Sequence, residues 1–480
     1  MRREKAALLT ILALVVSLWG CGSSVVSPPA GSPGSPSLGS TPPPPANSDV
    51  TISISPTSAV PGSPDVRLTL TGDFSLPQGQ YRWAVAWSVD GSETSLTITG
   101  MTSNQITAVI PAALLVTPVT AGVQAQLWFK ADSFPTAQSN VVVFRVSSSG
   151  FVSLGKMHAA RSGHTATLLR NGKVLIAGGG VASAEVFDPA TGSFSLTGRM
   201  RIRRSGATAT LLRGGQVLVC GGSDSSGTSL ASAEIFDFAT GTFSSTDNMT
   251  SARSSATATL LHNGTVLIAG GTDDHGLDLD TAELYDPLAG AFKAVSGKMV
   301  SRRSGHTATH LVNGKVLLTG GYRSSSAELF DPTTSTFTAT GSMATQRVFH
   351  TALLLPNGKV LILGGHASLF SRASAELYDP GSGVFTPSGS LNTARERHTA
   401  TLLRNGKVLV TGGGNWFSGP SAPQFQLLSS AELFNPAGKS AFIGDMENAR
   451  AGHTATMLVD GRVLVAGGDG PLATAELYKY

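Results

Sequence analysis

Residues Gly163 to Gly179 read GHTATLLRNGKVLIAGG, and edited copies of this stretch make seven units between residue 151 and the C-terminus. Within it, two apolar runs, HTATLL and KVLIAGG, flank the pair Asn171-Gly172. Asn-Gly between apolar runs is a strong hairpin signal, because both central residues of a type I′ turn need positive φ. The stretch therefore predicts a β-hairpin that is repeated along most of the chain.

Each unit continues with two further strand-like segments, which in the first unit are SAEVFDP (183–189) and the stretch from Phe194 to Met200. The closing Met or Leu of successive units recurs at intervals of 43 to 55 residues. Four short strands with a period near 50 residues are typical of a β-propeller blade. The hairpin turn recurs at 263–264, 313–314, 357–358 and 405–406, with Gly214-Gly215 and Asp460-Gly461 as substitutes.

A Gly pair follows the second strand of every unit, at 178–179, 221–222, 270–271, 320–321, 364–365, 412–413 and 467–468. This pattern resembles the kelch repeat, and the propeller of galactose oxidase is similar in form. One departure is that phenylalanine stands where kelch repeats commonly carry tryptophan, at Phe194, Phe243, Phe292, Phe337, Phe385 and Phe442. The resemblance implies a seven-bladed kelch-type β-propeller over residues 150–480.

The last unit, residues 446–480, has only three strand-like segments and stops at Tyr480. Phe151 to Met157 (FVSLGKM) reads as an isolated fourth strand placed before the first unit. We expect the two pieces to complete one blade, because closure by a strand from the other end removes the open edge of the ring.

The N-terminal residues 1–20 have a basic start and an apolar run from Ala6 to Trp19, which is too short for a stable membrane span and is typical of a secretory signal. The ending Leu-Trp-Gly-Cys21 resembles the lipobox of bacterial lipoproteins, which implies cleavage before Cys21 and lipid on its sulfur; an ordinary secretory peptide is the alternative. Gly22 in place of Asp implies, by resemblance to the Gram-negative sorting rule, the outer membrane. We expect an exported protein held at the outer membrane or cell surface through its lipid anchor only.

Residues 21–48 are rich in Ser, Pro and Gly and are typical of a tether that cannot form a core. Residues 49–148 contain seven β-rich runs separated by Pro, Gly, Asp and Asn, which predict an immunoglobulin-like β-sandwich. Runs such as ISPTSAVPGS and SNQITAVIPAALL resemble IPT/TIG-type surface domains. Trp83, Trp87 and Trp128 fall in these runs, where core packing is favoured over a sugar-stacking role. The predicted fold class is therefore all-β, with the sandwich preceding the propeller.

The formal net charge of +4 includes the leader residues Arg2, Arg3, Glu4 and Lys5, and removing them leaves +2. A nearly neutral body offers no electrostatic footprint for phosphates, so no nucleic-acid partner is expected. Cys21 and Cys220 are the only cysteines, which excludes a disulfide framework. Cys220 lies in an apolar run and is expected to be a buried core residue.

Strands alternate in direction within a blade, so the short turns share one face, and the loops after the Gly pairs share the other. The long loops, at 223–232, 272–280 and 414–430, lie on this second face, where we expect any binding site. Trp416, Phe417 and Phe425 in the longest loop are candidates for contact with a sugar or peptide, and burial of the rings within the loop is the alternative. The loop at 272–280 carries four carboxylates, Asp273, Asp274, Asp278 and Asp280. Clustered carboxylates can bind Ca²⁺, but their spacing here matches no known calcium loop, so a solvated acidic loop is favoured. No metal or other cofactor is predicted.

Each unit carries one Arg before its first strand and one Glu in its third, a regularity that predicts a repeated structural pair that knits the blades together. The residues are Arg161, Arg204, Arg253, Arg303, Arg347, Arg395 and Arg450, with Glu185, Glu234, Glu283, Glu328, Glu376, Glu432 and Glu476. Five units also place His three residues after the Arg, at His164, His306, His350, His398 and His453, where a metal role is possible in principle. Because these positions follow the repeat, we interpret them as structural.

The leading functional hypothesis is non-catalytic binding of a protein or glycan by the variable loops, and no catalytic residue is predicted. The alternatives are a structural spacer and, by resemblance to galactose oxidase, a copper radical oxidase or another carbohydrate-active enzyme. The oxidase family uses paired tyrosines and histidines at copper, with one Tyr cross-linked to Cys. Here Cys220 lies in a core strand, and Tyr285, Tyr378 and Tyr478 stand at positions held by Phe in other units.

Overall fold

The computed structural model describes residues 52–55, 58–59, 66–72, 74, 81–89, 92–115, 119–129, 137–138, 142–146, 150–418 and 423–480. The predicted leader (1–20), Cys21 and the tether (21–48) lie outside these residues, as does the side chain of Trp128. Within the described segments, no helix is long and apolar enough to cross a membrane.

The N-terminal domain consists of strands joined in the order β1-β3-β6-β5-β4-β7-β9-β2, with β8 paired to β7. One half of β5 pairs with β4 and the other half with β6, so this strand joins two sets of strands. Every run predicted from the sequence overlaps a strand, and β2 and β8 are short additions. The elements are β1 (Ser53–Ser55), β2 (Ser58–Ala59), β3 (Val66–Thr71), β4 (Tyr81–Val89), β5 (Ser92–Met101), β6 (Gln105–Ile110), the 3₁₀ turn η1 (Ala112–Leu115), β7 (Val119–Phe129), β8 (Ala137–Gln138) and β9 (Val142–Val146).

The core of this domain comes from alternate residues of β3, β4 and β6, since successive side chains of a strand point to opposite faces. Leu68, Val85 and Ile106 are fully buried. Trp83 and Trp87 are also buried, and the Trp83 indole donates to the Phe74 carbonyl at 3.2 Å. These two tryptophans therefore pack the core, as predicted. The immunoglobulin-like assignment stays a prediction.

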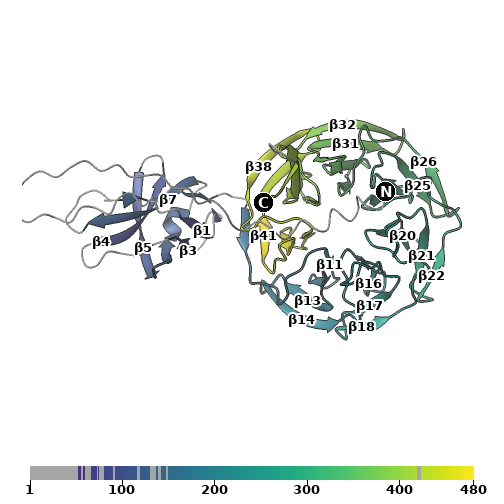
Figure 1. The fold of residues 1–480 in the computed structure, drawn as a ribbon, viewed down its shortest axis with the longest axis horizontal. Helices are drawn as coiled ribbons and strands as arrows, with labels where there is room; N and C mark the ends of the chain where they lie inside the picture. The colour runs from purple at the N-terminus through teal and green to yellow at the C-terminus, as the bar shows by residue number, and fades with distance from the viewer. Residues whose placement is uncertain are drawn as a thin grey trace, which may run out of the picture. The chain divides into compact units, whose positions relative to one another are not determined.

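Residues 150–480 form seven four-stranded antiparallel sheets arranged as the blades of a β-propeller (Figure 1). Blade 1 is β11 (His164–Leu168), β12 (Val174–Gly178), β13 (Ser183–Asp188) and β14 (Ser193–Arg199); blade 2 is β15 (Thr208–Leu211), β16 (Val217–Cys220), β17 (Ala233–Asp237) and β18 (Thr242–Ser245); blade 3 is β19 (Thr257–Leu260), β20 (Val266–Ala269), β21 (Ala282–Asp286) and β22 (Ala291–Ala294); blade 4 is β23 (Thr307–His310), β24 (Val316–Thr319), β25 (Ala327–Asp331) and β26 (Thr336–Ala339).

Blade 5 is β27 (Thr351–Leu354), β28 (Val360–Leu363), β31 (Ser374–Asp379) and β32 (Val384–Ser390); blade 6 is β33 (Thr399–Leu402), β34 (Val408–Thr411), β37 (Ser430–Asn435) and β38 (Lys439–Asp445). Blade 7 is β39 (Thr454–Met457), β40 (Val463–Ala466), β41 (Ala475–Lys479) and β10 (Gly150–Ser153). Neighbouring blades meet through their first strands, which are therefore innermost. This confirms the predicted all-β propeller.

Burial explains why the repeat specifies blades. Every residue of each second strand is buried, because blades pack on both of its faces. In blades 1 to 5, the third and fourth strands contribute a ring pair in which the repeated Phe of the fourth strand packs on an aromatic of the third, as for Phe187 and Phe194 with centroids 5.0 Å apart. Tyr285 takes the same place against Phe292 at 4.8 Å. In blade 6, Phe442 instead lies opposite Glu432 and is 48% exposed.

The predicted type I′ turn is wrong. Gly172 has φ of 82°, but Asn171 is not among the residues with positive φ. The Gly172 N–H donates to the Leu169 carbonyl at 3.0 Å, which makes a tight turn followed by a left-handed glycine, as in a three-residue hairpin loop. The Asn171 side chain accepts from the Lys173 N–H at 3.1 Å, so asparagine serves this turn through its side-chain oxygen.

The seventh blade contains a strand from before the first repeat. In antiparallel pairing, β10 lies along β41, with Phe151 opposite Tyr478 and ring centroids 5.1 Å apart. The strand is shorter than the predicted 151–157, and the chain beyond it stays attached through the Met157 N–H, which donates to the Ala473 carbonyl at 2.8 Å. The first and last parts of the propeller thus share one sheet.

Candidate functional site

The propeller has two chemically different ends. We call the end with the Asn-Gly hairpins the turn face, and the end with the loops after the Gly pairs and the connections between blades the loop face. On the loop face, isolated bridges join a connection to a loop, as between Val348 and His366 and between Glu396 and Gly414. These bridges hold the loop backbones to the scaffold.

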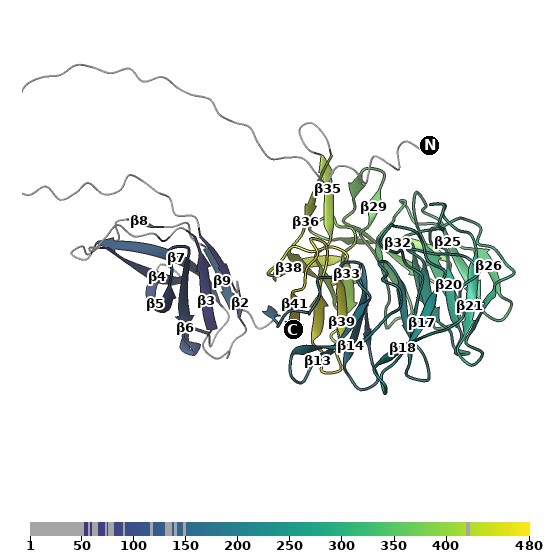
Figure 2. The same ribbon diagram turned by 60° about the horizontal axis from the view of Figure 1, so that its bottom comes forward.

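Two extra hairpins stand up from the loop face on neighbouring blades (Figure 2). Blade 5 contributes β29 (His366–Ala367) and β30 (Phe370–Ser371), and blade 6 contributes β35 (Gly414–Ser418) and β36 (Pro423–Leu427). Strand β30 packs beside β35, and the Trp416 N–H donates to the Ser371 hydroxyl at 3.0 Å. The blade 5 hairpin therefore braces the blade 6 hairpin.

The predicted aromatic residues lie on this braced hairpin. Trp416 faces Phe425 across the two strands, with ring centroids 5.0 Å apart. Trp416 is half-buried, whereas Phe417 is 37% and Phe425 is 39% exposed. The Phe425 ring lies against Gly414, where an added Cβ would approach it to 2.1 Å. The glycine lets the ring lie against the backbone, so the aromatic group is held in place while part of it faces solvent.

A pocket of about 350 Å³ opens on the same face between blades 4 and 5. The His366 ring forms an ion-pair contact with Glu396, with Nδ1 and Oε2 2.8 Å apart, and this carboxylate raises the pKa of His366 although burial opposes the shift. The Gln346 amide donates to the Ser368 hydroxyl at 2.9 Å. The lining residues are Tyr322, Arg323, Gln346, Val348, His366, Ala367, Ser368 and Leu369.

Sequence reasoning did not find this pocket. Its polar side chains come from three separate connections and loops, and none of them belongs to a repeated position. The one available signal was that the copies disagree just after the Gly pairs at 320–321 and 364–365, and Tyr322 and His366 are the residues that follow.

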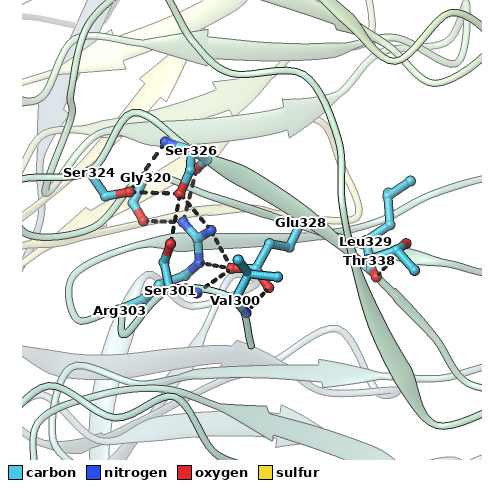
Figure 3. Close-up of polar contacts among 9 residues, drawn as sticks. All are labelled: Val300, Ser301, Arg303, Gly320, Ser324, Ser326, Glu328, Leu329 and Thr338. Atoms are coloured by element: carbon cyan, nitrogen blue, oxygen red, sulfur yellow. Dashed lines mark hydrogen bonds and ion pairs between the residues drawn. The ribbon is translucent and has the colours of Figure 1, made fainter. Parts of the chain in front are cut away.

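All seven predicted Arg–Glu pairs form, and both side chains of every pair are buried, with nitrogen-to-oxygen distances of 2.6 to 3.1 Å. In blade 4 the Arg303 guanidinium donates to Glu328 Oε1 at 2.6 Å and to the Gly320 carbonyl at 2.7 Å (Figure 3). The Glu328 carboxylate also accepts from the Val300 and Ser301 N–H groups, at 2.6 and 3.0 Å. The pair thus pins the incoming connection to its own blade.

The contact between blades runs through the backbone of the same arginine. The Arg303 carbonyl accepts from the Gly271 N–H of blade 3 at 2.8 Å. Equivalent bonds of 2.8 to 2.9 Å join the second glycine of each pair to the arginine of the next blade around the whole ring. The expectation that the Arg–Glu ion pair joins neighbouring blades is therefore wrong. Each ion pair lies within one blade, and the backbone carbonyl of its arginine accepts the hydrogen bond from the neighbouring blade.

The five repeated histidines are also buried, and each contacts the preceding blade. Each Nε2 lies 2.8 to 3.1 Å from a threonine hydroxyl of the preceding blade. Burial, and next the nearby arginine, lowers the pKa of four of them to about 3, and that of His453 well below its ordinary value. These rings are neutral near pH 7 and bridge blades.

The acidic loop of blade 3 does not gather its carboxylates. Asp273 accepts from the backbone of its own turn, and Asp280 lies 3.7 Å from the Lys298 ammonium. Over the described ranges, no group of three or more His, Cys, Asp or Glu side chains is placed to hold a metal ion. Cys220 is buried, and burial raises the pKa of its thiol to about 11.

Comparisons with known proteins agree with this geometry. The Kelch motif family model matches residues 203–250. Among solved structures, a fungal alcohol oxidase of the AA5 family in complex with copper aligns with a TM-score of 0.56 and 19% identity over 69% of this chain and 76% of that chain. YjhT aligns with a TM-score of 0.45 and 13% identity over 57% of this chain and 99% of that chain. No curated protein matches the chain. At 19% identity, the likeness to the oxidase concerns the fold alone.

Proposed function

Because residues 150–480 are a kelch-type β-propeller, we propose that the protein is a non-catalytic binding protein that takes a protein or glycan ligand on its loop face. The observation that carries the proposal is the exposure of Phe417 and Phe425 on a hairpin braced by the neighbouring blade. Rigidly held aromatic side chains supply contact area at low entropic cost, and loops on a rigid scaffold commonly carry binding sites. The pocket beside the hairpins adds polar groups to the same surface.

The test is binding of the purified protein to glycan arrays and in pull-down experiments, compared with a double variant, Phe417→Ser with Phe425→Ser. We expect the double variant to lose at least about tenfold in affinity, since each stacked ring contributes on the order of 1 kcal/mol. Phe442→Ser is the matched control, because Phe442 is 48% exposed on β38, the outer strand of the same blade. Unchanged binding by the double variant would overturn the proposal and favour a structural spacer.

The copper radical oxidase alternative needs a set of tyrosine, histidine and cysteine side chains around one metal. Tyr285 and Tyr378 are buried in blade cores, where each hydroxyl bonds a threonine, at 3.0 and 2.9 Å. The buried Cys220 thiol lies 3.2 Å from the Thr208 hydroxyl. Tyr285, Tyr378 and Cys220 are thus core residues that do not supply the ligands of such a copper centre, and among the described residues no group of three or more His, Cys, Asp or Glu side chains is placed to hold a metal ion. Copper analysis with an alcohol-oxidation assay tests this, and copper-dependent turnover would refute the non-catalytic proposal.

The proposal also includes the place of the protein in the cell. On this view the loop face works at the cell surface, and lipid on Cys21 holds the chain to the outer membrane. Cys21→Ala should move the protein from the membrane fraction to the soluble fraction. Retention in the membrane fraction would refute the anchor and leave the binding proposal untouched.

A further inference from the structure

Seven equivalent residues surround the propeller axis on the loop face, each two positions after the repeated arginine. They share a left-handed backbone, with φ between 52° and 64°. Around the ring, six of the seven neighbouring pairs are joined by a backbone hydrogen bond of 2.8 to 3.1 Å, in which the N–H of one residue donates to the carbonyl of the previous blade's residue. The residues are Gly163, Gly206, Ser255, Gly305, Phe349, Arg397 and Gly452.

The ring of hydrogen bonds requires a conformation that suits glycine. A side chain in the left-handed region is strained, and a bulky one such as Phe is an outlier. Ser255, Phe349 and Arg397 nevertheless occupy the ring. Backbone strain of this kind collects at ligand sites, so an observed outlier is grounds for a functional hypothesis.

The strain is concentrated in one sector. Six described residues other than glycine have positive φ, and four of them are Arg323, Phe349, Ser368 and Arg397. Arg323 and Ser368 line the pocket between blades 4 and 5. Phe349 and Arg397 adjoin it through their chain neighbours, because Val348 lines the pocket and Glu396 contacts His366. The strained residues therefore belong to one continuous surface.

The two ring side chains give this surface an apolar part and a polar part. Phe349 is 42% exposed, and its ring lies over Gly305, where an added Cβ would approach the ring to 2.9 Å. Arg397 pairs with Asp469 of blade 7, with Nη1 and Oδ2 2.8 Å apart, and Asp469 also accepts from the Ser162 hydroxyl. Phe349 thus extends over blade 4 and Arg397 toward blade 7, so the aromatic ring suits the apolar face of one sugar unit and the ion pair suits the hydroxyl groups of another unit along an oligosaccharide.

The charged side chains of this surface indicate which class of sugar it would bind. His366 is matched by Glu396, and Arg397 is matched by Asp469. Arg323, which lines the pocket over the Tyr322 ring, has no carboxylate within 4 Å in the part of the chain that the structure describes. Guanidinium groups bind carboxylates through paired hydrogen bonds. The unmatched charge therefore favours a ligand that brings its own carboxylate.

We propose that Phe349 and Arg397, with the pocket around Arg323, form a subsite for an oligosaccharide that contains uronic acid. Phe349 stacks on the apolar face of a sugar ring, the Arg397–Asp469 pair takes hydroxyl groups, and Arg323 pairs with the carboxylate. This inference rests on the proposed binding function and names the ligand class and the contact residues for it.

The experiment compares Phe349→Gly, Arg397→Gly and the control Ser255→Gly in thermal unfolding and in calorimetric binding of α-1,4-linked hexagalacturonate, with neutral maltohexaose as the matched probe. All three variants should raise the melting temperature by about 1–2 °C, because glycine relieves the strain. Phe349→Gly and Arg397→Gly should weaken binding of hexagalacturonate at least about tenfold, since each removes a direct contact. Ser255→Gly should leave binding unchanged, and Arg323→Gln should remove the preference for hexagalacturonate over maltohexaose.

The outcomes separate the two proposals. If the wild-type protein binds hexagalacturonate and Phe349→Gly and Arg397→Gly bind it equally well, the subsite is refuted while the proposed function stands. If the wild-type protein binds neither oligosaccharide, the ligand class is refuted, and the Phe417/Phe425 double variant decides the proposed function. A lower melting temperature in Phe349→Gly and Arg397→Gly would refute the argument from strain.

Discussion

Replacing Arg303 by Met removes the buried guanidinium while keeping most of the side-chain volume. Arg303 donates to the Gly320 and Ser326 carbonyls at 2.7 and 2.9 Å and to Glu328 Oε1 at 2.6 Å. In the variant, Glu328 keeps its bonds from two backbone N–H groups but loses its counter-charge in a site where it is 1% exposed. The buried Gly320 carbonyl and the partly buried Ser326 carbonyl also lose this donor.

Removing one partner of a buried ion pair typically costs about 3–5 kcal/mol. An unfolding entropy of about 2.1 cal/mol/K per residue gives about 0.7 kcal/mol/K for the roughly 330 residues of the propeller. The melting temperature of Arg303→Met should therefore fall by roughly 4–7 °C. Adding Glu328→Gln removes the unmatched charge and leaves an oxygen for one of the two backbone N–H groups, so the double variant should recover part of the loss.

Differential scanning calorimetry of the purified protein measures both effects. Lys315→Met is the matched control, because Lys315 pairs with Asp331 at 3.2 Å at the surface of the same blade. Such exposed pairs contribute about 0–1 kcal/mol, so the control should shift the melting temperature by no more than about 1 °C. A shift below about 1 °C in Arg303→Met, or a double variant no more stable than the single one, would refute the account of the buried pair.

Three further predictions concern acid, ring closure and the hairpin. Four of the five repeated histidines have a pKa of about 3 in the folded chain and about 6.5 in the unfolded chain, so between these pH values the unfolded state binds more protons. Stability should therefore fall as pH drops below 6.5, by up to about 1.4 kcal/mol per pH unit for each of these rings. Calorimetry from pH 7 to 5 checks this. His350→Ala introduces the residue that blades 2 and 3 carry at this position, Ala207 and Ala256, and should reduce the slope; an unchanged slope would contradict the assignment. Deletion of residues 150–157 exposes the edge of β41 and the Tyr478 ring, and should sharply lower the melting temperature of the propeller; an unchanged transition would show that closure contributes nothing. Gly414→Ala places a Cβ against the Phe425 ring, and should displace that ring and weaken ligand binding with little change in melting temperature; full affinity in the binding assay would argue against a fixed hairpin.

Predictions for residues that recur in every unit agreed with the structure better than predictions for single residues. The Arg–Glu pairs form, because a contact needed by every blade leaves the same residue types at the same spacing in each unit. Their geometry was only half predicted, since sequence spacing does not show that Glu328 also holds the Val300 N–H and that the link to blade 3 runs through the Arg303 carbonyl. The turn type at Asn171 was wrong for a similar reason: Asn-Gly suits more than one hairpin loop.

For the candidate site, the sequence pointed to the loop face, because the loops there vary in length between blades. It left open whether the aromatic rings of the longest loop are exposed, and the structure shows Phe417 and Phe425 partly exposed. It did not indicate that Tyr322, Gln346 and His366 line one pocket. These residues come from loops and connections of neighbouring blades, and only the packing of those blades brings them together.

The sequence by itself determined the blades, their number and the strand that completes the last one, because each blade is built from local hairpins whose apolar second strand must be buried. Only the tertiary structure decided which side chains meet across blades. The Arg397–Asp469 pair joins residues from two blades, and the left-handed backbone of Phe349 is maintained by hydrogen bonds to its ring neighbours. No periodic pattern encodes such contacts, because they depend on the conformations of individual loops after the ring has closed.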